Sequence, residues 1–368
     1  MGLIKLTKEQ KMIQTEFRKF AVSEIEPLAE EIEKKGVFPQ AIVDKLAELG
    51  LLGLIIPEKY GGVELDMTSL CIAVEEISRV CASLGTILVV NNCLVAYPLM
   101  HYGGDSFKNK YLNKLAAGEI GGFICQPEID LLEEQNDLKI EGDSIIFSGR
   151  REVVLNGSSA GFFILPLRWE DQVRYYLLES GKKGITMLPK SLLGLRAAGF
   201  SSAHFSETIL NDEDCFSSTG KMGKMNIQHV ANIGFAAVSL GIAQAAMEAA
   251  VKYSKERIQF EHRICEYPMV REMLAEMKLK IETARLLVYD AAFAFDAGEE
   301  YSIIAGIARL TAAETGFFCA LNGIQVHGGY GYMKDYPLER FFRDAKVLQF
   351  LETSPGLVKS QIAAELLK

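Results

Sequence analysis

The segment QFLETSP, residues 349–355, places a single carboxylate, Glu352, directly after an apolar pair and just before a Ser-Pro break. A carboxylate among apolar residues can act as a general base, because removal from water raises its affinity for a proton. A glutamate at the end of a helix can equally be a solvated polar residue at a junction. The residue types alone leave both interpretations open.

The composition indicates a globular protein whose ligands are small molecules rather than nucleic acid. The chain has 368 residues, of which 49% are hydrophobic, and a formal net charge of −9. That apolar fraction suffices for a sizeable core and argues against extensive disorder. Nucleic-acid binding favours a basic surface, so the acidic balance argues against DNA or RNA as a partner. It excludes no small anionic ligand, since a few local lysines or arginines can hold a diphosphate.

The N-terminus and the cysteines bear on location and redox chemistry. The opening stretch MGLIKLTKEQKMIQTEFRKF carries charges in every turn and has no uninterrupted apolar run. We therefore expect neither a signal peptide nor a membrane span. Seven cysteines are scattered without a CxxC pair, at positions 71, 81, 93, 125, 215, 265 and 319. This pattern predicts reduced, mostly buried thiols in a cytoplasmic protein, and no metal site.

Hydrophobic periodicity divides the chain into three segments. Residues 1–118 have helical spacing, including a helical signal from Thr7 to Gly36. Residues 119–223 change to a period of two, as in LKIEGDSIIFSG and QVRYYLLES, which predicts a small β-barrel or sandwich. Residues 224–368 return to helix, and NIQHVANIGFAAVSLGIAQ is apolar on nearly every face, as in a helix buried inside a bundle. The predicted fold class is mostly α with a central β module: an N-terminal helical domain, a β domain and a C-terminal four-helix bundle.

Several motifs in this order resemble the acyl-CoA dehydrogenase family along essentially the whole chain. GLLGLIIPEKYGG resembles that family's N-terminal turn, and LGIAQAAMEAAVKYSKERIQF resembles its first bundle helix with an Arg-x-x-Phe ending. IQVHGGYGYMKDYPLERFFRDAKVLQFLE resembles its C-terminal signature, which has a glycine-rich turn, an Arg-Asp pair and a glutamate. Separate matches in the same order make chance similarity a poor explanation.

The resemblance implies an activity, a cofactor and partners. In that family FAD lies between the β module and the bundle, members are typically dimers of dimers, and electrons pass to electron-transferring flavoprotein. A glutamate removes the α-proton of an acyl-CoA while the β-hydrogen leaves as hydride to the flavin, which produces a 2-enoyl thioester. Aligned through ERFFRDAKVLQFLE, Glu352 falls on the family's catalytic base. A thioester α-proton is weakly acidic, so desolvation and hydrogen bonds to the thioester oxygen must bring the two pKa values together.

The flavin loop of the β module departs from the family pattern. Cys125, Gln126 and Pro127 replace a Thr-Glu-Pro sequence, and the small-residue turn that follows it in the family is missing. A diphosphate favours amide donors and no negative charge. The same stretch instead carries four acids, Glu128, Asp130, Glu133 and Glu134.

Two further segments near the expected flavin ring also differ. Val153, Val154 and Leu155 replace an aromatic-Ile-Thr trio, which removes a stacking surface and a hydroxyl; as strand residues they can also simply be core. Thr353 stands where the family has glycine after the base, and Ser354 follows it. A β-branched residue crowds the approach of a ligand, although its hydroxyl can supply a hydrogen bond.

The residues that complete a neighbouring subunit's flavin site in that family are better preserved. Arg257 and Phe260 keep the Arg-x-x-Phe ending, and QVHGGYG keeps the glutamine and the paired glycines, whereas Asn232 replaces a common arginine. The candidate cofactor-binding residues are Arg257, Phe260, Gln325, Gly328, Gly329, Cys125, Val154, Leu155 and Ser354, and the candidate substrate-binding residues are Thr353 and Asn232.

Three functional hypotheses follow. The first is a working FAD-dependent acyl-CoA dehydrogenase with Glu352 as its base. The second is a non-catalytic or half-site subunit of a hetero-oligomeric dehydrogenase, which completes a partner's FAD site while its own flavin is weak, shared or absent. The third keeps the fold but changes the substrate or the chemistry, for example to an acyl chain on a carrier protein, because function resides in the site rather than in the fold.

Overall fold

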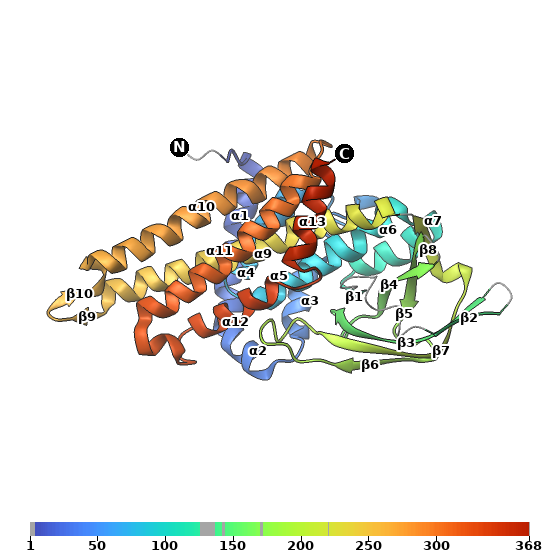
Figure 1. Ribbon diagram of the computed structural model, residues 1–368, viewed down its shortest axis with the longest axis horizontal. Helices are drawn as coiled ribbons and strands as arrows, with labels where there is room; N and C mark the ends of the chain where they lie inside the picture. Colours follow the sequence, from blue (N-terminus) through green and yellow to red (C-terminus); the bar gives the residue numbers. More distant parts are fainter. Residues whose placement is uncertain (1–3, 126–136, 142–143, 170–171, 220, 368) are drawn as a thin grey trace.

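The computed structural model describes residues 4–125, 137–141, 144–169, 172–219 and 221–367. Along the chain, short helices are followed by a β-sheet and then by long helices (Figure 1). The long helices extend away from the sheet, and the N-terminal helices pack along one side of them. This confirms the predicted fold class, which is mostly helical with a central β module.

The first helix is well specified by its sequence, but the helical signal that follows is divided. In α1 (Lys8–Phe20) the Thr7 hydroxyl accepts a hydrogen bond from the Gln10 backbone at 3.1 Å, and the Gln10 side chain accepts one from the Thr7 backbone at 3.1 Å. A π turn and a 3-10 turn containing Pro27 then separate α1 from α2 (Ala29–Lys35). Proline lacks the backbone donor and clashes with the preceding turn, which explains the break.

Two buried asparagines, Asn91 and Asn92, stabilise the N-terminal helical part, and Asn91 also joins it to the sheet. They lie in the π-helical segment η5 (Val90–Ala96), and the Asn91 side chain donates to the Leu52 carbonyl at 2.9 Å and accepts from the Gly121 backbone at 2.9 Å. The first strand is thereby fixed against the helices. The other N-terminal helices are α3 (Gln40–Glu48), α4 (Met67–Ser78), α5 (Ala82–Val89), α6 (Tyr97–Tyr102), α7 (Asp105–Phe107) and α8 (Asn113–Ala116).

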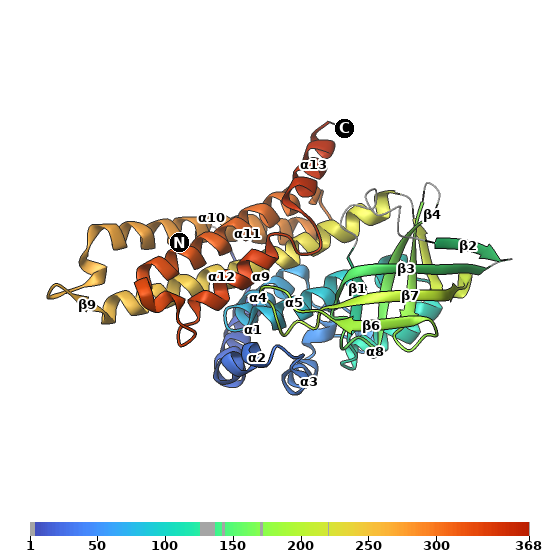
Figure 2. The same ribbon diagram turned by 60° about the horizontal axis from the view of Figure 1, so that its bottom comes forward.

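The β module is an eight-stranded, mainly antiparallel sheet with the order β6-β7-β3-β1-β4-β5-β8, and β2 pairs with β3 (Figure 2). Its strands are β1 (Gly121–Ile124), β2 (Asp137–Glu141), β3 (Ser144–Leu155), β4 (Phe162–Trp169), β5 (Gln172–Glu179), β6 (Ile185–Pro189), β7 (Ser201–Leu210) and β8 (Cys215–Thr219). The period-two segments of the sequence therefore form strands as expected. One face of the sheet encloses a small apolar core of its own, and the other joins the main core with the helices.

The C-terminal helices surround α9 (Lys221–Glu256), which is buried from Ile227 to Ala243. Its small apolar residues allow α4, α10 and α11 to pack against it. Between α9 and α10 lies a short hairpin of β9 (Ile258–Gln259) and β10 (His262–Arg263), at the end of the molecule away from the sheet (Figure 1). The remaining C-terminal elements are α10 (Pro268–Asp296), α11 (Ser302–His327), η11 (Gly328–Tyr332), α12 (Leu338–Leu348) and α13 (Pro355–Leu366).

Three helical stretches have the length and apolar composition to cross a membrane: Ala82–Tyr102, Ile227–Glu256 and Ser302–Tyr332. In this fold the first two are almost entirely buried and the third is about half buried, because they form the core of the helical part. All seven cysteines are free, and five of them are buried, as the sequence predicted.

Candidate active site

Glu352 lies on the short turn between α12 and α13. The two neighbours Leu351 and Thr353 are buried at 4% and 3% exposure, while the Glu352 side chain is half-buried. The backbone of Glu352 is left-handed, with φ of +68°. This conformation costs a non-glycine residue about 1–2 kcal/mol, so tertiary contacts must hold the turn.

A buried amide orients the Glu352 carboxylate. The Gln228 side chain, on α9, donates from Nε2 to Oε2 of Glu352 at 2.8 Å and is itself buried. Its oxygen accepts a hydrogen bond from the side chain of Gln361, on α13, at 3.2 Å. Glu352 is therefore oriented from inside the protein and does not simply extend into solvent. Sequence analysis did not single out Gln228, although a polar residue inside the apolar run NIQHVANIGF is a usable signal.

Among the described residues, Glu352 interacts electrostatically with a thiol, a phenol and a cation. Burial raises the pKa of the Cys125 thiol well above its ordinary value, and the nearby Glu352 charge adds to this. Burial likewise raises the pKa of Tyr175, with smaller contributions from Tyr102 and Glu352. Both groups are therefore uncharged at neutral pH. The cation is Arg309, a buried residue on α11. Burial lowers the pKa of its guanidinium, and the Glu352 charge opposes that shift.

The strand segment at the expected flavin ring presents an apolar wall. Ile124 of β1 pairs with Val154 of β3, and the Cys125 backbone donates to the Val153 carbonyl at 3.0 Å. Leu155 and Cys125 are buried in the main core, and the half-buried Val153 packs against it. Val154 instead lies in the separate core of the β module, so only its backbone can face a ligand on the helical side.

The two residues after Glu352 have different surroundings. The Ser354 hydroxyl accepts from the Leu357 backbone at 3.2 Å and so caps α13, with Pro355 at the first helical position. The Thr353 hydroxyl is buried and has no hydrogen-bond partner within the described residues. It lines a small cavity of about 100 Å³ beside Arg309.

Asn232 is the second polar residue on the same face of α9, one turn after Gln228. Its exposure is 1%, and neither atom of its amide has a hydrogen-bond partner in the described part of the chain. An unsatisfied buried amide costs about 1–3 kcal/mol. A polar atom of a ligand or a water would remove that cost.

The remaining candidates gather at the opposite end of the bundle. Arg257, Gln325, Gly328 and Gly329 line a surface cavity of about 570 Å³, where the Arg257 guanidinium lies 5.5 Å from the centroid of the Tyr330 ring. A Cβ atom at either glycine would meet nothing within 4 Å, so the backbone there is open to a ligand. Phe260, at the tip of the β9–β10 hairpin, is 88% exposed and has φ of +50°.

The structure therefore separates the candidates into two groups. Gln228 lies on α9 and Arg257 directly follows that helix, about 40 Å away at 1.5 Å per residue. Glu352 lies close enough to Cys125, just after β1, to affect its thiol, whereas the β9–β10 hairpin that follows Arg257 lies at the end of the molecule away from the sheet (Figure 1). That distance is longer than an extended dinucleotide, so one chain cannot bring both groups to one cofactor.

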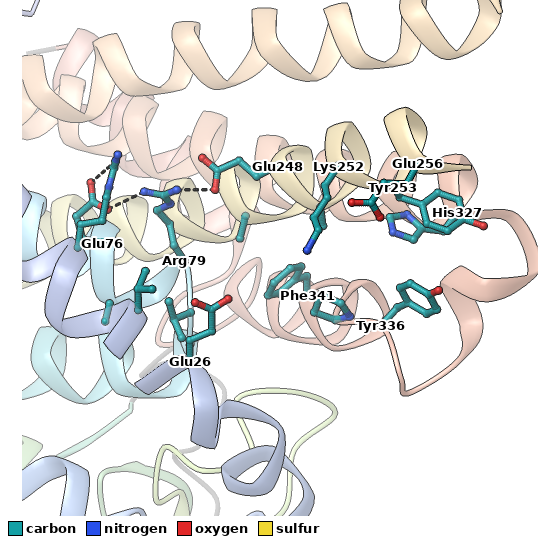
Figure 3. Close-up of a pocket in the computed structure, with 17 residues that line it drawn as sticks. Glu26, Glu76, Arg79, Glu248, Lys252, Tyr253, Glu256, His327, Tyr336 and Phe341 are labelled. Carbon is teal, nitrogen blue, oxygen red and sulfur yellow. Dashed lines mark hydrogen bonds and ion pairs between the residues drawn. The ribbon is translucent and has the colours of Figure 1, made fainter. Parts of the chain in front are cut away.

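A second cavity, of about 420 Å³, lies between α9, α12 and the N-terminal helices (Figure 3). At one end Arg79 pairs with Glu76 at 2.8 Å and with Glu248 at 2.5 Å, so these charges are largely neutralised. At the other end Tyr253 stacks on His327 with ring centroids 4.2 Å apart. None of the residues that line this cavity contacts Glu352. The cavity lies along the half of α9 that ends at Glu256.

The loop that the sequence singled out as acidic and atypical lies outside the described residues. It comprises Gln126, Pro127, Glu128, Asp130, Glu133 and Glu134.

Two models of one protein family match most of this chain. Residues 7–119 match the family model of the acyl-CoA dehydrogenase N-terminal domain, and residues 225–367 match that of the C-terminal domain. The chain belongs to the acyl-CoA dehydrogenase family. This confirms the resemblance seen in the sequence.

Relatives within the acyl-CoA dehydrogenase family cover the chain almost completely. A short-chain-specific acyl-CoA dehydrogenase from Clostridium acetobutylicum is 34% identical, over 99% of both chains. Butyryl-CoA dehydrogenase from Megasphaera elsdenii has the same fold with a TM-score of 0.93, at 29% identity over 99% of this chain and 100% of that one. A chain of the structure described as the electron transferring flavoprotein of Acidaminococcus fermentans gives a TM-score of 0.94, at 32% identity over 100% of both chains.

Proposed function

We propose that this chain is a FAD-dependent dehydrogenase of short-chain acyl-CoA thioesters, with Glu352 as its base. One observation carries the proposal: a half-buried carboxylate is oriented by the buried Gln228 amide, on the helical side of the apolar wall formed by Leu155 and Cys125. The short chain follows from the substrates in the names of the similar proteins. A cytoplasmic location and an electron-transferring flavoprotein as electron acceptor fit the same relatives.

The chain's own residues account for the proton step. The thioester would lie with its α-carbon beside Glu352, where Oε1 of the carboxylate takes the α-proton while Gln228 holds Oε2. The buried apolar side chain of Leu155 and the uncharged thiol of Cys125 would limit the access of water to the reacting α-carbon. Bound FAD supplies the acceptor for the β-hydrogen, which leaves as hydride and completes the two-electron oxidation to the 2-enoyl thioester.

The residues that would hold FAD come from two subunits. Near Glu352, the apolar wall of Val153, Leu155 and Cys125 would cover one face of a ring system, and backbone groups of β1 and β3 are the available donors. The ADP half requires a positive charge and open backbone, which Arg257, Gly328 and Gly329 provide at the far end of a second copy of this chain. We therefore propose a homodimer, or a dimer of dimers, with FAD at the interface.

Replacement of Glu352 by glutamine tests the proposal. Glu352→Gln keeps the shape and the hydrogen-bonding capacity but cannot take a proton, so α-proton exchange of butyryl-CoA in D2O should fall at least a thousandfold while the oligomer persists. Exchange is followed by mass spectrometry, and assembly by size-exclusion chromatography. Retention of exchange in the variant would show that another group is the base.

A second candidate function is favoured by the unequal loss of flavin contacts. Val153 and Leu155 are aliphatic where the family has a stacking ring and a hydroxyl, while Arg257, Gln325 and the paired glycines are all present and accessible. Such a chain would complete the FAD site of a partner subunit with an intact loop. Flavin counted per subunit, for the chain alone and with a co-encoded homologue, separates the two functions: one FAD per subunit in the homomer excludes the second.

A further inference from the structure

Arg309 is a charged residue in the core that the proposed reaction leaves unexplained. It lies in the middle of α11 with 3% exposure. Its Nη2 donates to the backbone carbonyls of Leu348 at 2.5 Å and of Leu351 at 3.1 Å. These two carbonyls lie at the end of α12 and immediately before Glu352. One side chain therefore holds both the end of α12 and the residue immediately before the base.

The charge of Arg309 has no partner carboxylate at contact distance in the described part of the chain. Burial lowers the pKa of Arg309 to about 10. The negative charge of Glu352 raises this pKa and so offsets part of the effect of burial. With that pKa the guanidinium remains protonated at neutral pH. Its face lies 5.2 Å from the centroid of the Phe235 ring, which holds it in a dry environment. A cation in such a place acts more strongly on Glu352 than one in water would.

One guanidinium nitrogen of Arg309 makes no hydrogen bond to the described residues. This Nη1 atom is buried, as is the equally unpartnered hydroxyl of Thr353, and both residues line the cavity of about 100 Å³. A cavity of that size, with polar groups on its walls, is large enough for water to bridge them. The turn is thus supported by charged and polar groups on its inner side, while Gln228 holds the carboxylate.

We propose that Arg309 is the positioning residue for Glu352. By donating to the carbonyls of Leu348 and Leu351 it holds the left-handed turn, and its charge favours the ionised form of the carboxylate that must accept the α-proton. The inference rests on the proposed role of Glu352 as the base. Arg309 itself touches neither substrate nor cofactor in this role.

Several charged and titratable groups face this pair among the described residues. Facing Glu352 are Cys125 from the end of β1, Tyr175 from β5 and Arg309 from α11. On the other side of Arg309, the exposed Glu314 lines the same small cavity. The thiol and the phenol are uncharged near neutral pH, so neither of them would account for a change in the pH dependence of proton removal when Arg309 is replaced.

The first test compares Arg309→Met with Arg309→Lys in the assembled protein. With butyryl-CoA in D2O, we expect R309M to lower α-proton exchange at pH 7 at least tenfold and to move the pH midpoint of exchange up by about one unit. A lysine at this position keeps the positive charge, but its shorter side chain can donate to fewer of the two carbonyls of Leu348 and Leu351. We therefore expect R309K to restore the midpoint of the wild type with only part of its rate. An unchanged midpoint in R309M overturns the proposal.

The matched control is Arg285→Met. Arg285 is also largely buried, but it pairs with Glu75 at 2.9 Å on another side of the bundle. Its loss should lower the melting temperature without moving the pH midpoint of exchange. An equal shift of the midpoint in R285M would show that loss of stability alone explains the effect, and this too overturns the proposal.

A second measurement does not depend on activity. We compare the loss of melting temperature caused by R309M in the wild type and in the E352Q background at pH 7.5. If Arg309 attracts the Glu352 charge, R309M should cost several degrees less in E352Q, whereas equal losses contradict the proposal. Absence of exchange in the wild type, together with this coupling, would reject Glu352 as a base but keep Arg309 as the residue that positions it.

Discussion

Asp344 and Glu352 are carboxylates of the same C-terminal segment, yet their surroundings differ. Asp344, near the end of α12, is fully buried and accepts a hydrogen bond from the Leu195 backbone at 2.6 Å. Glu352 is half-buried and accepts from the Gln228 side chain. The first carboxylate fixes the connection between β6 and β7 to α12, and the second is the proposed base. Only the second is available for proton transfer to a ligand.

Asp344 gives the fold a pH dependence that can be measured. Burial raises the pKa of Asp344 from 3.8 to about 6, and the nearby Glu33 charge adds to this. The folded protein therefore binds the proton more tightly than the unfolded chain does, and this contribution to stability is present below pH 4 and lost as the pH rises to 6. A shift of this size corresponds to about 3 kcal/mol.

Asp344→Asn should remove that dependence, because the amide oxygen can still accept from Leu195 but does not ionise. We expect the unfolding free energy of the wild type, relative to D344N, to decrease by about 2 kcal/mol between pH 4.5 and pH 7, because part of the effect is already lost at pH 4.5. Urea unfolding at both pH values, at one protein concentration, measures the difference. A constant difference would mean that Asp344 is ionised throughout this range.

For single residues, the position of Glu352 could be predicted from the sequence, but the residues that hold it could not. Glu352 follows a recognisable run of residues, so its position could be inferred from the motif. Gln228 is 124 positions away along the chain, and Arg309 is 39 and 42 positions from the carbonyls that it contacts. Contacts of this kind leave no local pattern, because they arise only when α9, α11 and α12 are packed together.

The helices pack closely where their facing residues are small. On α9, a Cβ atom at Gly241 would lie 2.6 Å from the Glu75 carbonyl and 2.7 Å from Cβ of Ser78. These atoms belong to α4, and backbone cannot move aside as the end of a side chain can. Gly241 therefore sets the distance between the N-terminal helices and the bundle.

Gly241→Ala should destabilise the protein by about 2 kcal/mol. Overpacking costs about 1–3 kcal/mol, and the better helix propensity of alanine returns up to about 1 kcal/mol. Gly306→Ala is the matched control on α11, since its new methyl would meet only the flexible side chains of Ile362 and Val358. Thermal unfolding of both variants measures the contrast, and equal melting temperatures would argue against a close α4–α9 contact.

The elements themselves were largely readable from the sequence. The alternating segments of residues 138–141, 144–149, 172–179 and 201–210 all form strands, in a sheet with one face in the core of the β module and the other against the main core. The helical signal from Thr7 to Gly36 was less informative about shape, since periodicity continues through the turn at Pro27 while the helix axis does not. The close approach at Gly241 could not be read at all, because glycine in a helix is compatible with many environments.

For the molecule as a whole, the main consequence is that the two halves of the proposed cofactor site lie at opposite ends of one chain. Glu352 and the wall of Leu155 lie beside the sheet, and Arg257 lies at the end of the bundle. A complete site therefore needs the near group of one subunit and the far group of another.

This arrangement predicts complementation between two inactive variants. Glu352→Gln damages only the near group and Arg257→Glu only the far group, so homomers of either should be inactive. In a mixed dimer, one site combines both defects and the other combines two intact groups. We expect co-expressed, doubly tagged dimers to recover up to about half of the wild-type dehydrogenase activity. Activity no higher than that of the two homomers would place both groups in one site of one subunit.

The length of α9 has a consequence for how this chain can change over time. Gln228 lies on α9, and Arg257 directly follows it. The uninterrupted helix between them fixes the distance between the two proposed ligand sites. Inserting a single residue between them would turn Arg257 by about 100° and displace it by about 1.5 Å. Even the removal of two whole turns, which keeps the faces nearly aligned, would draw the ends together by about 10 Å. Insertions and deletions in this helix would therefore disturb the proposed sites more than substitutions at its exposed positions would.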